Sequence, residues 1–186
     1  MKLGYKIIFL LSLILIPNAK AAENLILYKG TFSRSIKIEE LYKFTTSSKA
    51  SPKLKNLIRI TNQKEKELLN VLTTKIEVPL KTSSKLMNSK IGEVFLKRIS
   101  NIIYPNKILD KEISIKALRS AILLGSFNNN QKISLIDFFK AYPNKNVAID
   151  LQALSKTLKK VESLKELIEF YSDSPFKKLK DGRSSI

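Results

Sequence analysis

The residues that carry out most enzyme chemistry are missing from this chain. Its 186 residues include no histidine and no cysteine. This removes the commonest general base, the usual metal ligands and every Ser-His or Cys-His nucleophile. The five glycines form neither a phosphate-cradling loop nor a G-x-S-x-G elbow. We therefore expect no catalytic, metal-binding or cofactor-binding residues, and no enzyme activity of the chain itself.

Two remaining patterns have the residue types for catalysis, and both are weak. Ser174 and Lys177 fit the S-x-x-K spacing of a serine–lysine dyad, but their lysine-rich tail offers no buried site to lower a lysine pKa. Glu162, Glu166 and Glu169 share one face of a predicted helix. Glycosidase chemistry needs two opposed carboxylates, and one solvated helix face does not supply them.

The stretch SIKALRSAILLGSF, residues 114–127, is a candidate for binding instead. At about 100° per residue its apolar side chains cover a broad arc, and Arg119 lies at the edge of that arc. We favour a central core helix whose arginine reaches a carboxylate or water at the rim; ligand anchoring is the alternative. Ala117, Ala121 and Gly125 recur at every fourth position, which would let a neighbouring helix approach closely. Replacing Arg119 by leucine is expected to affect stability more than any activity.

A second candidate is a cluster of aromatic residues in the stretch that follows Ser134. Beside a broad apolar helix these rings could line a pocket for a lipid or another apolar molecule, although such residues more often fill a core. Together with two arginines they complete the candidate ligand- or partner-binding set, which is Arg34, Arg119, Phe138, Phe139 and Tyr142.

Residues 1–21 predict a cleavable secretory signal. Lys2 and Lys6 precede an apolar run over residues 7–16, and residues 19–21 form an A-x-A cleavage site. The run has half of the roughly 20 apolar residues that a membrane-spanning helix needs; an uncleaved anchor is the alternative. We expect an exported protein of the periplasm or thylakoid lumen, with no transmembrane segment after cleavage.

The chain is strongly basic, and its excess charge is carried by lysine. Cleavage removes three of the 34 basic residues and no acid, which leaves 31 against 16 acids and a net charge of +15. Arginine, which binds phosphates and base edges through two parallel hydrogen bonds, occurs only five times. This composition predicts weak, salt-sensitive attraction to anionic surfaces, and nucleic-acid binding is not expected.

The rest of the sequence predicts a mainly α fold, a bundle of about six to seven helices with an N-terminal β-hairpin. Apolar residues alternate over residues 25–38 around Gly30, as in a hairpin. Residues 147–150 are either a strand or an extended lead-in, with Asp150 capping the last helix. We expect one domain at residues 22–171 and a basic mobile tail at 172–186. Helices are expected at residues 39–44, 51–60, 61–72, 90–104, 114–127, 134–142 and 151–171, with a short helical turn at 81–87 and loops at 45–50 and 126–131. Thr61 or Asn62 is expected to cap the third of these helices.

Five segments, in this order, resemble a helical domain of unknown function that precedes the catalytic domain of exported cyanobacterial α/β-hydrolases. The resemblance extends from about Leu25 to Leu158 and agrees with a mostly α fold. The segments are YKGTFSRSIKIEELYKF, SPKLKNLIRI, LMNSKIGEVFLKRI, ALRSAILL and SLIDFFKAYPNKNVAIDLQ.

The resemblance implies an accessory role rather than catalysis. In that family the hydrolase domain, which carries the nucleophile elbow and histidine, follows the helical region, and this chain ends where it would begin. The resemblance therefore implies a stand-alone copy of the accessory part, without an inherited ligand site. The expected partner is a separately encoded α/β-hydrolase or another envelope protein; a lipid carrier and a binder of anionic surfaces are the alternatives.

Overall fold

The computed structural model describes residues 21–61, 64–108 and 110–158. The predicted signal peptide up to residue 20, the predicted tail at 172–186 and the Ser174 and Lys177 pair lie outside the described residues. The last predicted helix, residues 151–171, is described only as far as residue 158. These expectations remain predictions.

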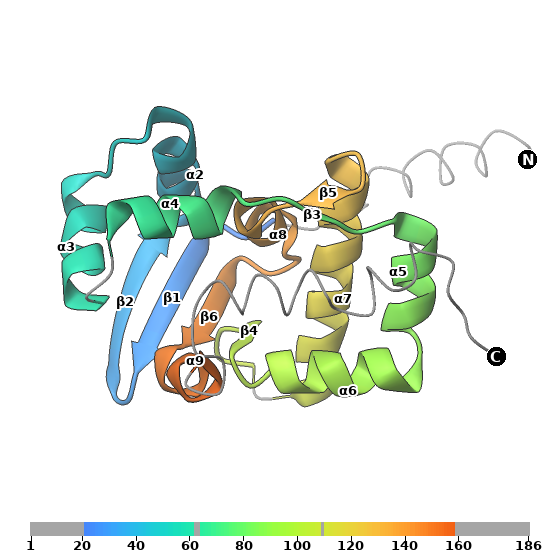
Figure 1. The fold of residues 1–186 in the computed structure, drawn as a ribbon. Helices are drawn as coiled ribbons and strands as arrows, with labels where there is room; N and C mark the ends of the chain where they lie inside the picture. The colour runs from blue at the N-terminus through green and yellow to red at the C-terminus, as the bar shows by residue number, and fades with distance from the viewer. Residues whose placement is uncertain (1–20, 62–63, 109, 159–186) are drawn as a thin grey trace, which may run out of the picture.

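The mainly α fold with an N-terminal hairpin is confirmed, with eight helices and six short strands in the described residues. Helices α2, α3 and α4 gather at the β2 end of the sheet, and α5, α6 and α7 lie toward its other end (Figure 1). The elements are β1 (Asn24–Lys29), β2 (Phe32–Lys37), α2 (Ile38–Ser47), α3 (Pro52–Thr61), α4 (Glu65–Thr73), β3 (Ile76–Glu77), α5 (Leu80–Met87), α6 (Lys90–Ile99), β4 (Ile103–Pro105), α7 (Lys111–Asn128), β5 (Lys132–Ile133), α8 (Leu135–Ala141), β6 (Asn146–Asp150) and α9 (Leu151–Leu158).

The hairpin closes through a two-residue turn at Gly30 and Thr31. Lys29 lies opposite Phe32 in the register of β1 and β2. Gly30 has a φ of +61°, while Thr31 is not among the described residues with positive φ. A positive φ at the first central position alone defines a type II′ turn, which matches the twist of the two strands and favours glycine there.

A four-stranded sheet in the order β2-β1-β6-β4 is the feature that the sequence did not predict. Strand β1 pairs antiparallel with β2 and parallel with β6, and β4 pairs antiparallel with β6. Leu25 faces Ile36 on one side and Val147 on the other, and all three are buried. The apolar face of the hairpin is thus continued into the interior by a strand more than 100 residues away.

Residues 147–150 combine both structures that the sequence allowed. They belong to β6, with Val147 and Ala148 fully buried. Asp150 ends the strand and caps α9, because its Oδ1 accepts hydrogen bonds from the backbone N–H groups of Gln152 at 2.8 Å and Ala153 at 2.9 Å.

The helix expected over residues 90–104 is too long by five residues. Helix α6 ends at Ile99, and Ile103 and Tyr104 belong instead to β4, opposite Ile149 and Ala148 of β6. Their apolar side chains fit a helix or a strand equally well, so pairing with β6 decides between the two. Pro105, which has no N–H to donate, ends β4 at an outer position of the sheet.

Helix α7 is the central helix, as expected, and it starts earlier than expected. It runs from Lys111 to Asn128 because the Asp110 side chain accepts from the backbone N–H of Glu112. It contacts α5, α6, α8 and β4. Ala117, Ala121 and Gly125 are buried, which confirms the close approach. A β-carbon on Gly125 would lie 2.4 Å from Ile133 Cδ1.

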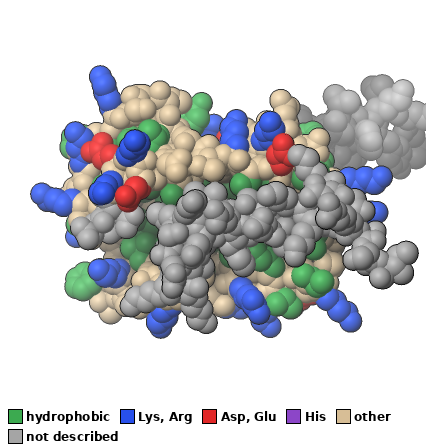
Figure 2. Space-filling model, viewed as in Figure 1, with side chains coloured by type: hydrophobic (Ala, Val, Ile, Leu, Met, Phe, Trp, Pro, Cys, Tyr) green, Lys and Arg blue, Asp and Glu red, His purple; other side chains and the backbone are tan. Residues whose placement is uncertain are grey.

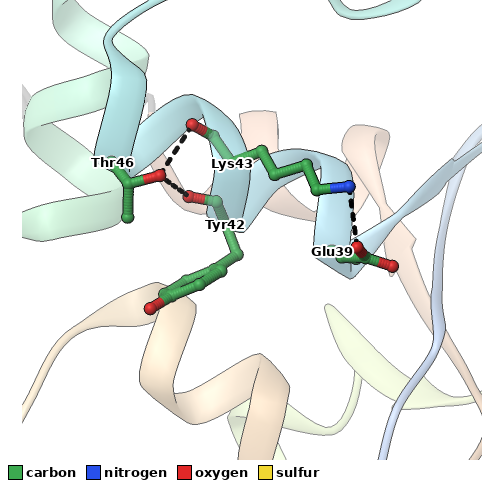
Figure 3. A network of polar contacts seen from close by, with 4 residues as sticks. All are labelled: Glu39, Tyr42, Lys43 and Thr46. Atoms are coloured by element: carbon green, nitrogen blue, oxygen red, sulfur yellow. Dashed lines mark hydrogen bonds and ion pairs between the residues drawn. The ribbon is translucent and has the colours of Figure 1, made fainter.

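Two helix boundaries also differ from expectation. Helix α2 continues to Ser47, through part of the predicted loop. In this last turn Thr46 Oγ1 donates to the Lys43 carbonyl at 3.0 Å (Figure 3), and Ser47 Oγ donates to the same carbonyl at 2.8 Å. Helix α4 is capped at Lys64 rather than at Thr61, which belongs to α3. The alternative cap, Asn62, lies outside the described residues.

The turn between α5 and α6 leaves no room for a side chain on Gly92. Ser89 Oγ donates to the Leu86 carbonyl at 2.7 Å and accepts from the Gly92 N–H at 3.2 Å. A β-carbon on Gly92 would lie 1.9 Å from the Leu86 carbonyl oxygen and 2.9 Å from Met87 Cα. Because these atoms are main chain, they cannot move aside without shifting α5.

We therefore predict that Gly92→Ala lowers the free energy of unfolding by about 2 kcal/mol or more, measured by urea denaturation. Gly125→Ala is the matched comparison. There the obstacle is the end of the Ile133 side chain, which can rotate, and alanine gains up to about 1 kcal/mol of helix propensity over glycine. An equal or smaller loss for Gly92→Ala would contradict the packing of α6 on α5.

Candidate binding surfaces

Arg119 binds the end of a neighbouring helix. Its side chain is half-buried, and its Nε donates to the carbonyl of Met87, the last residue of α5, at 3.0 Å. This acceptor is a main-chain carbonyl, which the sequence did not predict. A guanidinium at this position satisfies a carbonyl that the helix leaves unpaired and complements the negative end of the helix dipole.

The three aromatic candidates form one buried cluster. Phe138 packs edge-on against Phe139, with ring centroids 5.5 Å apart, and against Tyr142, with centroids 5.7 Å apart. All three side chains are buried, Tyr142 completely. Edge-to-face geometry and burial are what core aromatic residues adopt, so the structure places this cluster in the core of α7 and α8.

The hydroxyl of Tyr142 is the polar exception within that cluster. Among the described residues it has no hydrogen-bond partner, although it is fully buried. Burial raises the pKa of Tyr142 well above its ordinary value of 10, because the phenolate would lose its hydration. An unpartnered buried hydroxyl also costs free energy in the folded state.

Arg34 lies apart from the other candidates, on β2. It is exposed, and its Nη1 donates to the carbonyl of the preceding residue, Ser33, at 3.2 Å. Beside it is a surface depression with a volume of about 50 Å³, far below the several hundred Å³ of ligand pockets. The depression is lined by Arg34, Ser35 and Ile36 of β2 and by Lys53, Asn56, Leu57 and Ile60 of α3.

Large apolar side chains are exposed close to this depression. Phe32, which shares a face of β2 with Arg34, is 76% exposed, and Ile60 on α3 is 52% exposed. Phe32, Lys53 and Ile60 were not among the binding residues that the sequence predicted. The predicted hairpin placed Phe32 on a strand, but the sequence did not show that this strand lies at the edge of the sheet. Only the strand order shows that β2 is an outer strand.

The outer face of α2 carries exposed interactions that contribute little to stability. Lys43 Nζ lies 2.8 Å from Glu39 Oε1, and Figure 3 shows this contact. The hydrogen bond and the opposite charges lower the pKa of Glu39 and raise the pKa of Lys43. Tyr42 points away from the pair (Figure 3), and Lys140 Nζ of α8 lies 3.9 Å from its ring centroid. Such exposed pairs are screened by solvent.

The basic residues do not form one patch on the face shown in Figure 2, where separate lysine and arginine side chains surround the grey region. In the part of the chain that the structure describes, acidic residues do not gather into a group suited to a metal ion. No helix in those same ranges has the length and apolar character to cross a membrane.

Comparison with protein families assigns the chain. Residues 21–150, more than two thirds of the 186, match the family described as "alpha/beta hydrolase of unknown function (DUF1400)". The protein belongs to this family. The match agrees with the resemblance that the five sequence segments indicated, as far as an α/β-hydrolase-related family of unknown function. Neither the curated proteins nor the solved structures contain a significant match to the chain.

The family description does not by itself decide whether this chain is catalytic. A hydrolase nucleophile elbow is a sharp turn from a strand into a helix, with G-x-S-x-G at its centre. This chain has no such motif and no histidine. In the described residues, β1 and β6 form the one parallel strand pair. The matched region is therefore mainly helical with small sheets.

For Arg119→Leu we predict a loss of about 1–3 kcal/mol in the free energy of unfolding, because the Met87 carbonyl loses a charge-assisted hydrogen bond. Urea denaturation monitored by circular dichroism measures this loss. Arg98→Leu, an exposed arginine on α6, is the matched control and should change stability by no more than about 0.5 kcal/mol. Equal stabilities of the two variants would contradict a structural role for Arg119.

Tyr142→Phe is predicted to raise the free energy of unfolding by about 1 kcal/mol at neutral pH, since it removes a buried hydroxyl without a partner. Tyr28→Phe is the control of opposite sign, because the Tyr28 hydroxyl donates to Asn106 Oδ1 at 2.7 Å.

The same substitution tests the raised pKa of Tyr142. Above about pH 10 the unfolded chain releases the tyrosine proton before the folded chain does, so the wild-type protein loses stability as the pH rises. Urea denaturation at about pH 9 and pH 11 should show a smaller loss for Tyr142→Phe than for the wild type. An equal loss would contradict the buried environment of this hydroxyl.

Proposed function

We propose that this protein is an exported, non-catalytic helical module that binds a protein partner, foremost a separately encoded α/β-hydrolase. The observation that carries the proposal is the contrast between the family description and the residues of this sequence. The chain belongs to a family described as an α/β-hydrolase of unknown function, yet its sequence contains no histidine, no cysteine and no nucleophile elbow. A chain of this family without its own catalytic residues fits the role of an accessory to an enzyme that has them.

Export is supported by the sequence of the first 21 residues, with their basic start, apolar run and A-x-A site. The compartment that fits such a signal is the periplasm or the thylakoid lumen. The resemblance to a domain of exported cyanobacterial hydrolases supports the same placement. A partner that meets this protein would then be exported too, or lie in the envelope.

The carrier alternative has less support. Its motivation was the aromatic cluster, and Phe138, Phe139 and Tyr142 pack against one another in the core. None of them lines the depression beside Arg34. Electrostatic attraction to anionic surfaces rests on the net charge of +18 for the whole chain, and it would weaken steeply as salt rises.

A pull-down tests the proposal directly. The tagged protein, expressed in its own cells, is recovered from envelope extract at about 0.15 M salt, and the proteins bound to it are quantified by mass spectrometry. We expect an α/β-hydrolase in about a one-to-one ratio. Repeated recovery of no protein, or of lipid alone, would overturn the proposal.

An esterase assay tests the non-catalytic part. The purified chain should hydrolyse p-nitrophenyl butyrate no faster than buffer, and the recovered partner should hydrolyse it. Ser174→Ala is the control, because it removes the serine of the S-x-x-K pattern. Turnover by the purified chain that Ser174→Ala abolishes would show that the protein is itself an enzyme.

A further inference from the structure

Strand β2 leaves one edge of the sheet without a neighbouring strand. It pairs with β1 on one side, and the order β2-β1-β6-β4 places it at the end of the sheet in the residues that the structure describes. Backbone N–H and C=O groups on the free side of such a strand can accept a further strand. The register shows which groups these are.

Hydrogen-bonded and non-bonded pairs alternate along an antiparallel ladder. The type II′ turn makes Lys29 and Phe32 a bonded pair. Six positions further along each strand, the N–H of Ile38 donates to the Glu23 carbonyl at 2.9 Å, so this pair is bonded too. The bonded pairs at the two ends of the hairpin therefore fit the same alternation of hydrogen-bonded and non-bonded pairs. Phe32, Arg34 and Ile36 bond to β1, and the backbone groups of Ser33, Ser35 and Lys37 point away from it.

The outward direction of these groups is visible in one contact. The Ser33 carbonyl accepts a hydrogen bond from Arg34 Nη1 at 3.2 Å, so the guanidinium folds back along the open edge. Ser33 and Ser35 are both exposed. An incoming strand would find outward backbone groups at every second residue, with a cationic side chain beside them.

The depression next to this edge fits side chains of an added strand rather than a small molecule. Its volume of about 50 Å³ is large enough for an apolar group, and Leu57 and Ile60 of α3 provide an apolar wall. The exposed ring of Phe32 extends the apolar surface at the turn end of β2. Alternate side chains of an extended peptide point to one face, so every second residue would contact this wall.

The charges around the edge select the kind of peptide. Arg34 and Lys53 line the depression, and none of the seven lining residues is acidic. Antiparallel pairing of β2 with β2 of a second copy, centred on Arg34, would place the two Arg34 side chains directly opposite each other, and like charges across a strand pair are destabilising. Charge complementarity therefore favours a different chain with acidic residues.

We propose that the open edge of β2 binds an extended, acidic segment of the partner protein by β-strand addition. Backbone hydrogen bonds form with Ser33 and Ser35, carboxylates of the segment contact Arg34 and Lys53, and apolar side chains contact Ile60. This inference deepens the proposed function and rests on it for the identity of the partner.

Synthetic peptides test the binding mode without knowledge of the partner. Fluorescein-labelled octapeptides of alternating valine and glutamate, of alternating valine and lysine, and of valine and glutamate with every second amide N-methylated are titrated with the full chain. Fluorescence anisotropy at about 0.15 M salt gives each Kd. We expect the valine–glutamate peptide to bind about tenfold more tightly than the other two. Equal binding of the N-methylated peptide would overturn strand addition, because that peptide keeps the charge and loses the backbone donors.

Charge reversal locates the site. Arg34→Glu with Lys53→Glu should weaken binding of the valine–glutamate peptide about tenfold or more. Lys90→Glu with Lys97→Glu changes the net charge equally on α6, toward the other end of the sheet (Figure 1), and should leave Kd nearly unchanged. An equal effect of both pairs would mean binding by net charge alone and would overturn the proposal.

The two proposals fail separately. If the pull-down recovers a hydrolase and the Arg34→Glu, Lys53→Glu variant retains it fully, the module binds its partner through another surface and the edge proposal is wrong. If the peptide binds at the edge but the pull-down repeatedly recovers no protein, the edge is a binding site and the proposed function is wrong.

Discussion

Strand β1 pairs in parallel with β6, so that Asn24 lies opposite Asn146. Helices α2 to α8 all belong to the segment of the chain that connects these two strands. Two parallel strands cannot be linked by a tight turn, so the chain must cross over between them. Here the crossover is most of the domain. Burial of Leu25, Ile36 and Val147 in one row ties the two ends of the matched family region together and leaves β2 as the outer strand.

Within that crossover, the end of α5 is held by main-chain contacts from two directions. Gly92 of α6 lies against the backbone of Leu86, and Arg119 of α7 donates to the Met87 carbonyl. Arg119, a candidate ligand anchor from the sequence, thus contributes to the packing of α5, α6 and α7. At the β2 edge, by contrast, Phe32 and Ile60 are exposed, and Arg34 and Lys53 line the depression.

Several elements were predictable because their signals are local. Gly30 between two alternating stretches predicts the hairpin, Ser134 predicts the start of α8, whose capping box it forms with Asp137, and the small residues of α7 predict close packing. Other elements were not predictable. Ile103 and Tyr104 fit a helix as well as a strand, and the acceptor of Arg119 lies 32 residues away. Helix α2 continues through Thr46 to Ser47, where composition suggested a loop.

The sequence by itself determined the mainly α class, the hairpin and the missing catalytic groups, because composition, spacing and turn chemistry act over a few residues. Only the tertiary structure decided that residues 103–105 and 146–150 are strands, that Phe138, Phe139 and Tyr142 fill the core, and that Arg34 lies on an open edge. Strand order and burial depend on contacts between distant segments, and local propensity carries no information about which segments meet.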